Sequence, residues 1–257
     1  MLKKNYLWVA FSTLYRYNWM TTLRYHAMLW IDSINAMLMI AVFAVIGTTH
    51  SDIYQTNQLY VIGLGLLAMV LMTRAYFSTA HGLMYYKLER VLENYVMSPL
   101  PGWLWLSTVM LEETQNAFLA TLPYMLLLLV LGLPMPTLTG FLLALSLILL
   151  IMMFFIPLGF MMMLPAQKWN DLSKWDNTII YPALMLSGTF FDATALPEQY
   201  RFLMEYNPLY MLQHGLRELW FLHKVPPLHT YVTLGTMAFL SFTITMLMLN
   251  RGYGLKK

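Results

Sequence analysis

Four charged side chains interrupt stretches that are otherwise apolar, and they are the first candidates for function. Asp32 and Arg74 lie inside two hydrophobic runs, and Glu112 and Glu113 open the apolar part of a third. A charge in hydrocarbon is costly unless it is paired or faces water. We expect these four side chains to form one charge cluster in the cytoplasmic leaflet of the membrane. It acts either as a structural clamp, with Asp32 paired to Arg74, or as a hydrophilic vestibule for substrate.

Other apparent functional motifs are rejected because the surrounding sequence does not support them. Gly63, Gly65 and Ala68 match the spacing of a dinucleotide-binding loop, but no strand precedes them and they lie inside an apolar run. The chain has six histidines without metal-ligand spacing and no cysteine, so no metal site is expected. Ser187 beside Gly188 lacks the flanking pattern of a serine hydrolase. We expect no catalytic residue.

The composition favours lipid rather than water as the environment. The 257 residues are 59% hydrophobic and 11% charged, whereas soluble domains are about 25% charged. Six apolar stretches are near the roughly 20 residues that a membrane-spanning helix requires. Lipid cannot satisfy exposed backbone polar groups, so each should be a helix. The prediction is an all-α polytopic membrane protein with one domain, 1–257, and spans at 28–46, 59–80, 103–131, 138–164, 177–191 and 229–249.

Basic residues indicate the orientation. With the N-terminus inside, twelve of the fifteen Lys and Arg residues fall on the cytoplasmic side, and only Arg201, Arg217 and Lys224 fall outside. Cytoplasmic loops of membrane proteins are rich in Lys and Arg. We therefore expect both termini in the cytoplasm of a bacterium, with the chain in its inner membrane. The chain has no acidic or basic tail, so we do not expect nucleic acid as a partner.

Two cytoplasmic segments should lie outside the spans. Residues 1–25 combine Trp and Tyr with Arg16 and Arg24, as in a helix lying in the membrane interface or an aromatic anchor for the first span. Residues 85–97 have apolar side chains at helical spacing, and prolines 99 and 101 end the pattern. Such a helix either offers a polar face to a soluble partner or lies on the membrane surface. The candidate docking residues are Lys87, Leu88, Glu89, Arg90, Leu92, Glu93 and Asn94.

The outer segment, residues 192–227, is the longest stretch between spans. It predicts two short helices, 197–206 and 209–222, separated at Asn207-Pro208 because the residue before proline avoids the α region. Its leucines and aromatics are too apolar for free solution, and its charges forbid a full span. We expect a re-entrant helical hairpin that acts as an outer gate. Its candidate residues are Pro197, Tyr200, Asn207, Pro208, Arg217 and Glu218.

In this order, the features resemble the type-2 ABC-transporter permeases, especially the branch that exports capsular and O-antigen polysaccharides. The most specific stretch is 184–218, with Leu-Ser-Gly-Thr-Phe-Phe, Leu-Pro-Glu-Gln-Tyr, Asn-Pro-Leu and Leu-Arg-Glu in succession. Leu-Glu-Arg and Ser-Pro-Leu-Pro within 88–101 stand at the place of the family's coupling helix. Asn-Arg-Gly-Tyr-Gly-Leu follows the last span at 250–255.

The resemblance implies a homodimer of six-span subunits in membrane lipid, with a cytoplasmic ABC ATPase under each. The chain lacks a Gly-x-x-x-x-Gly-Lys-Ser/Thr loop. ATP and Mg are therefore expected in the ATPase, with no cofactor in this chain, which is a pore-forming subunit rather than an enzyme.

A polysaccharide or lipid-linked glycan is the expected cargo, because sugars stack on aromatic faces. The candidate pathway aromatics are Tyr76, Phe77, Tyr181, Phe190 and Phe191. Three alternatives stay open: export of a drug, lipid or other small amphiphile, a membrane-embedded enzyme, and a non-transporting membrane scaffold.

Overall fold

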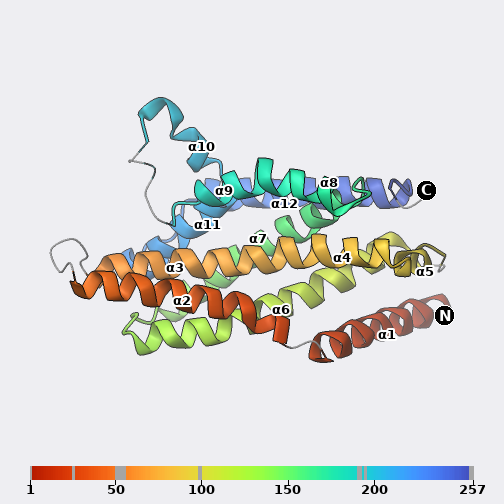
Figure 1. The fold of residues 1–257 in the computed structure, drawn as a ribbon, viewed down its shortest axis with the longest axis horizontal. Helices are drawn as coiled ribbons and strands as arrows, with labels where there is room; N and C mark the ends of the chain where they lie inside the picture. The colour runs from red at the N-terminus through yellow and green to blue at the C-terminus, as the bar shows by residue number, and fades with distance from the viewer. Residues whose placement is uncertain are drawn as a thin grey trace.

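The computed structural model describes residues 2–24, 27–49, 56–97, 100–189, 193 and 196–254, and every regular element among them is helical (Figure 1). The all-α prediction is confirmed for this part of the chain. The first elements are α1 (Leu2–Arg24), α2 (Ala27–Thr49), α3 (Thr56–Thr73), the π-helical turn η1 (Arg74–Ser78), α4 (Thr79–Leu88), α5 (Val91–Met97), α6 (Gly102–Val130) and α7 (Leu138–Met163). They are followed by α8 (Trp169–Trp175), η2 (Asp176–Ile180), α9 (Tyr181–Met185), η4 (Glu198–Tyr200), α10 (Phe202–Glu205), α11 (Pro208–Arg217), η5 (Glu218–Leu222) and α12 (Leu228–Asn250).

Several helices suit a membrane. Among the described residues, three are both long and apolar enough to cross one: Leu59–Leu88, Leu138–Met163 and Leu228–Asn250. Helices α2 and α6, of 23 and 29 residues, also exceed the length of about 20 residues that a span requires. These five helices coincide with five of the six predicted stretches, as expected for a polytopic membrane protein.

The prediction for the fifth stretch, 177–191, is displaced. Its helix begins earlier and runs without interruption through α8, η2 and α9, from Trp169 to Met185. It starts there because Asp171 Oδ2 accepts hydrogen bonds from the backbone N–H groups of Gln167 and Lys168. It ends before Gly188, whose φ of +84° is left-handed. At 1.5 Å per residue it is about 25 Å long, which is shorter than a hydrocarbon core of about 30 Å.

The predicted amphipathic helix 85–97 is wrong as a single element. Its first four residues form the end of α4, a turn follows at Glu89 and Arg90, and α5 begins at Val91. Arg90 has a φ of 58°, a left-handed conformation that no helix can continue through. The turn breaks the helical phase, so Leu88 is exposed while Leu92 is buried. The two leucines do not share the predicted apolar face.

Helix α7 lies at the centre of the bundle and packs against α12, α4, α3 and α11. Gly159 permits its close approach to η1, because a Cβ there would lie 3.0 Å from the carbonyl oxygen of Tyr76. On the opposite side, Thr245 of α12 donates a hydrogen bond to the carbonyl of Pro157 at 2.8 Å. The hydrogen bond from Thr245 and the close packing at Gly159 thus fix α7 between its neighbours.

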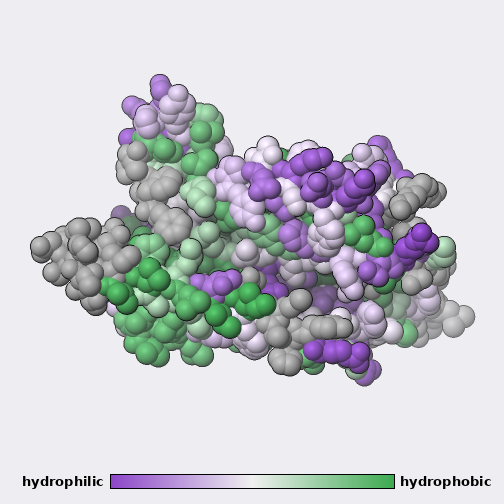
Figure 2. Space-filling model, viewed as in Figure 1, coloured by the Kyte–Doolittle hydropathy of each residue, from purple (hydrophilic) through white to green (hydrophobic). Residues whose placement is uncertain are grey.

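The two ends of the bundle differ. Helix α1 begins and α12 ends at the right of Figure 1, where α5 also lies, while α2 and α6 end at the left. Short α10 projects away from the bundle. Hydrophobic residues gather at the left over α2 and α3, and hydrophilic residues gather over α8 towards the right (Figure 2). This separation suits a protein whose apolar part faces lipid.

Candidate functional site

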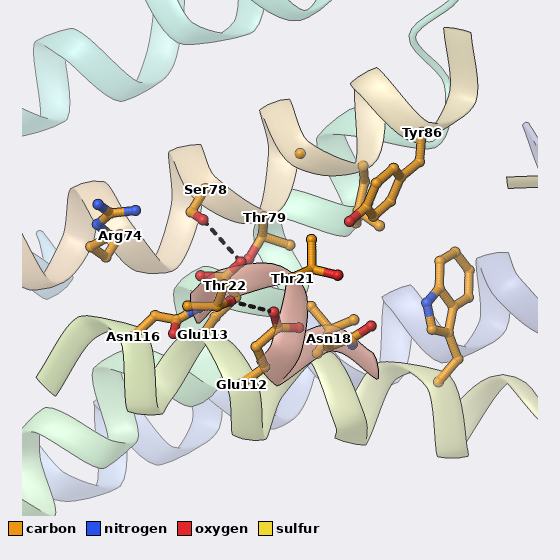
Figure 3. A pocket seen from close by; sticks show the side chains of 14 residues that line it. Asn18, Thr21, Thr22, Arg74, Ser78, Thr79, Tyr86, Glu112, Glu113 and Asn116 are labelled. Atoms are coloured by element: carbon orange, nitrogen blue, oxygen red, sulfur yellow. Dashed lines mark hydrogen bonds between the residues drawn. The ribbon is translucent and has the colours of Figure 1, made fainter. Parts of the chain in front are cut away.

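The main candidate site is a polar cavity where α1, the η1–α4 segment and α6 meet (Figure 3). Its volume is about 200 Å³. The side chains around it are mostly polar, although α6, which carries five of them, is largely apolar. The lining residues are Asn18, Thr21, Thr22, Arg74, Ser78, Thr79, Gly82, Leu83, Tyr86, Trp105, Val109, Glu112, Glu113 and Asn116. We refer to it as the α1–α4–α6 cavity.

Hydroxyl groups hold both carboxylates of this cavity. Thr22 of α1 donates to Glu112 Oε1 at 3.0 Å, and Ser78 of η1 donates to Glu113 Oε1 at 2.9 Å (Figure 3). Asn116 donates to the Thr22 hydroxyl at 3.4 Å. These bonds join three segments of the chain, so the cavity depends on the docking of α1.

Two buried acceptors in the cavity remain open. Glu113 is 8% exposed and Asn116 is 4% exposed, yet Glu113 Oε2 and Asn116 Oδ1 have no hydrogen-bond partner among the described atoms. The cavity therefore has unused hydrogen-bond acceptors and a carboxylate deep in a helical bundle.

The structure brings together three of the four charges predicted as a cluster. Arg74, Glu112 and Glu113 all line the cavity. The side chain of Asp32 is outside the described residues, so its pairing with Arg74 stays a prediction. Sequence reasoning missed the contribution of α1, which was assigned only to the interface. The spacing of Asn18, Thr21 and Thr22 at i, i+3 and i+4 was the available signal for a polar face.

A second polar group lies between η1–α4 and η2. Buried Asp176 accepts a hydrogen bond from the Tyr76 hydroxyl at 2.8 Å and contacts His81 Nε2 at 2.9 Å. The Phe77 ring centroid lies 5.4 Å from that of His81 and 5.8 Å from that of Tyr181. Three predicted pathway aromatics thus meet in one place, at an acidic residue that sequence reasoning did not select. Phe190 and Phe191 are outside the described residues.

The predicted docking residues do not form one surface. Lys87 Nζ donates to the carbonyls of Leu164 and Ala166 at 2.7 and 2.8 Å, so it satisfies the end of α7 instead of facing a partner. Leu92 is buried. Four of the remaining docking residues are exposed around the α4–α5 turn, and the Asn94 side chain is not described. The exposed residues are Leu88, Glu89, Arg90 and Glu93.

In the outer segment, α11 is tied to the turn after α9. Asn207 Nδ2 donates to the carbonyls of Ala183 and Leu186 at 2.6 and 3.0 Å, and Asn207 Oδ1 caps α11 by accepting from Leu209 N. Arg217 donates to the Gly188 carbonyl at 2.6 Å. The break between two helices therefore lies at Asn207-Pro208, as predicted.

The six predicted gate residues differ in exposure. Pro197 and Tyr200 are exposed, Pro208, Arg217 and Glu218 are partly buried, and Asn207 is buried. Glu218 Oε2 lies 3.7 Å from His214 Nδ1. The gate residues on α11 and η5 are thus held in the bundle, whereas those before α10 lie on the surface.

No metal centre accompanies these sites within the described ranges, which contain no group of three or more His, Cys, Asp or Glu able to hold an ion. The glycines of the apparent dinucleotide loop instead serve packing. A Cβ at Gly65 would lie 3.0 Å from the Thr189 Cα, and one at Gly63 would lie 2.7 Å from a Leu128 methyl group.

Comparison with known proteins extends the sequence resemblance. The profile of the family described as ABC-2 type transporter matches residues 9–221. The chain is similar to the inner membrane transport permease YadH of Escherichia coli strain K12, with 23% identity over 97% of this chain and 98% of that protein. The permease of the same name in Shigella flexneri matches equally.

Proposed function

The chain belongs to the ABC-2 type transporter family, and from this premise we propose that it is the membrane subunit of an ABC exporter for a polysaccharide or lipid-linked glycan. We propose that it works as a homodimer with a separate cytoplasmic ATPase that binds ATP and Mg. It lies in a bacterial inner membrane with both termini in the cytoplasm. The family match along most of the chain is the observation that carries this proposal.

The α4–α5 turn supports an ATPase partner. It lies at the end of the bundle where α1 begins and α12 ends (Figure 1), which is the cytoplasmic end in the proposed orientation. Glu89, Arg90 and Glu93 are exposed there. Exposed charges of both signs favour recognition by a soluble protein, and Arg90 stands at the tip of the turn.

The aromatic group around Asp176 supports a glycan as cargo. Trp169 and Tyr181 are both more than 40% exposed, although they flank a buried carboxylate. Exposed rings beside hydrogen-bonding groups suit a sugar, which offers apolar faces and hydroxyls together. Export of a small amphiphile is the second candidate, and the α1–α4–α6 cavity favours it because a cavity of about 200 Å³ holds a head group rather than a polymer.

Co-purification with the ATPase tests the assembly. Arg90→Glu reverses the charge at the turn without entering the core, so we expect the variant to remain folded and to recover several-fold less ATPase. Arg251→Glu is the matched control, since Arg251 is an exposed basic residue just after α12. Equal ATPase recovery with both variants would refute the docking surface.

Surface glycan in a deletion strain tests the cargo. Loss of the gene should abolish surface polysaccharide and leave the glycan inside the cell, and the wild-type chain should restore export. Normal surface polysaccharide together with raised retention of an amphiphilic dye would instead support the second candidate.

A further inference from the structure

We propose that the α1–α4–α6 cavity binds the ammonium group of an amine-bearing amphiphile. The inference concerns binding by this chain itself. It does not depend on glycan export or on the ATPase, and it bears on the small amphiphile that is the second candidate cargo. It rests on the open acceptors, the charge, the aromatic lining and the apolar surroundings of the cavity.

The hydrogen-bonding state of the cavity calls for a donor. Glu113 Oε2 and Asn116 Oδ1 are buried and have no hydrogen-bond partner among the described residues. An unsatisfied buried acceptor costs about 1–3 kcal/mol, and more when it is charged. An ammonium group has three donors and no acceptor, so it can satisfy both atoms without adding an unsatisfied group of its own.

The charge of the described lining favours a cation. Glu112 and Glu113 contribute two carboxylates, and Arg74 contributes one guanidinium. When both acids are ionised, as an ammonium group beside them favours, the described side chains carry a net negative charge that this ammonium group neutralises. A phosphate or carboxylate ligand would face two carboxylates and is disfavoured.

Two aromatic side chains complete the environment. Tyr86 and Trp105 line the same cavity. Trp105 precedes Glu113 by eight residues, about 12 Å along α6, so these rings are placed to contact the chain of the ligand rather than its ammonium group. The volume of about 200 Å³ compares with about 30 Å³ for one water molecule in the liquid. An aminoethyl head group therefore fits with room for water.

The surroundings suggest an amphiphile rather than a small soluble amine. Met20 of α1 and Leu111 of α6 are exposed apolar residues that immediately precede cavity residues Thr21 and Glu112 in the sequence. Glu112 lies about 15 Å along α6 from the first residue of that helix, at 1.5 Å per residue. A ligand can thus place its head group in the cavity and its tail along the apolar surface beside it.

Titration with dodecylammonium tests the proposal on the full chain in nanodiscs of phosphatidylglycerol, which has no amine. We expect saturable binding of dodecylammonium in excess of that to protein-free nanodiscs of the same lipid, and no such excess for dodecanol at the same concentrations. Glu113→Gln keeps an oxygen for the Ser78 bond but removes the charge, and it should weaken binding at least tenfold. Glu113→Asp, which keeps the charge, should retain more of the affinity than Glu113→Gln.

Glu205→Gln is the matched control, because Glu205 is exposed on α10 outside the cavity, and its affinity should equal that of the wild type. Equal affinity of the wild type and Glu113→Gln would overturn the proposal, as would equal binding of dodecanol. Glu112→Gln provides a second variant if Glu113→Gln does not fold, and unchanged affinity in it would count equally against the site.

Nanodiscs that contain phosphatidylethanolamine distinguish the two sources of the amine. Competition that weakens dodecylammonium binding in the wild type assigns the site to a lipid head group. Undiminished binding assigns it to an amphiphile other than that lipid. Either result identifies the ligand of the same ammonium site.

Discussion

Replacing Asn207 with alanine tests how α11 is held to the bundle. In the wild type this one side chain caps the N-terminus of α11 and donates to the carbonyls of Ala183 and Leu186 at the end of α9. Both carbonyls belong to the last turn of a helix, where no intrahelical donor is available. Alanine leaves three backbone groups without their partner at once, and Asn207 is only 7% exposed, so water cannot easily replace it.

The expected loss of stability follows from these bonds. Removal of an N-cap costs about 0.5–2 kcal/mol, and each buried carbonyl left without a donor costs about 1–3 kcal/mol. The contributions overlap, and we expect about 3–5 kcal/mol in total. With about 2–4 °C per kcal/mol for a chain of this size, Tm should fall by roughly 10 °C.

Thermal unfolding of the detergent-solubilised chain measures this effect. Asn207→Asp separates its two parts, because aspartate keeps the capping oxygen but replaces the donor with a carboxylate that faces two carbonyls. We expect it to be nearly as damaging as Asn207→Ala. Gln199→Ala, an exposed position in the same segment, should change Tm by no more than about 1 °C. A fall of less than about 2 °C for Asn207→Ala would refute the reasoning.

Three further predictions concern other parts of the bundle. Lys87→Met should lower stability by about 1.5–3 kcal/mol, because a charged donor to the end of α7 is lost; an unchanged Tm with reduced ATPase recovery would instead place Lys87 at the docking surface. Gly159→Ala should cost about 1–3 kcal/mol because its Cβ would lie 3.0 Å from a carbonyl of η1. Gly235→Ala, with no heavy atom within 4 Å, should be neutral or up to about 1 kcal/mol stabilising, and equal Tm values for the two would contradict the packing argument. In the cysteine-free chain, a membrane-impermeant thiol reagent should label Leu203→Cys, which is 46% exposed in the wild type, more than about tenfold faster than buried Leu216→Cys, and similar rates would contradict the described packing of α11.

The sequence alone predicted the parts of the fold that depend on local chemistry. Helices α2, α6, α7 and α12 lie within a few residues of the predicted stretches, because a lipid-facing helix needs a continuous apolar run. The break before Pro208 was also predicted, since proline restricts the residue that precedes it. The family resemblance came from short motifs in the same manner, and the family match bears it out.

The helix of α8, η2 and α9 shows where local reasoning failed. Lys174 and Asp176 made its first half too polar for a predicted span. Asp176 is nevertheless buried in a helix, because Tyr76 and His81, about a hundred residues away in the chain, bond to its carboxylate. Hydropathy counts a charge as a cost and contains no information about distant partners.

The polar sites were decided by tertiary structure. The sequence identified Arg74, Glu112 and Glu113 as charges in apolar surroundings, but it did not indicate that α1 would supply Thr22 to the same cavity. It also placed Lys87 on a solvated face, whereas Lys87 bonds to carbonyls 77 and 79 residues further along the chain. The turn at Glu89 and Arg90 contains neither glycine nor proline, so the sequence did not predict it. Residue types therefore determined that this chain enters a membrane as helices, and the packing of those helices decided which polar groups meet, because such contacts join residues that are far apart in sequence.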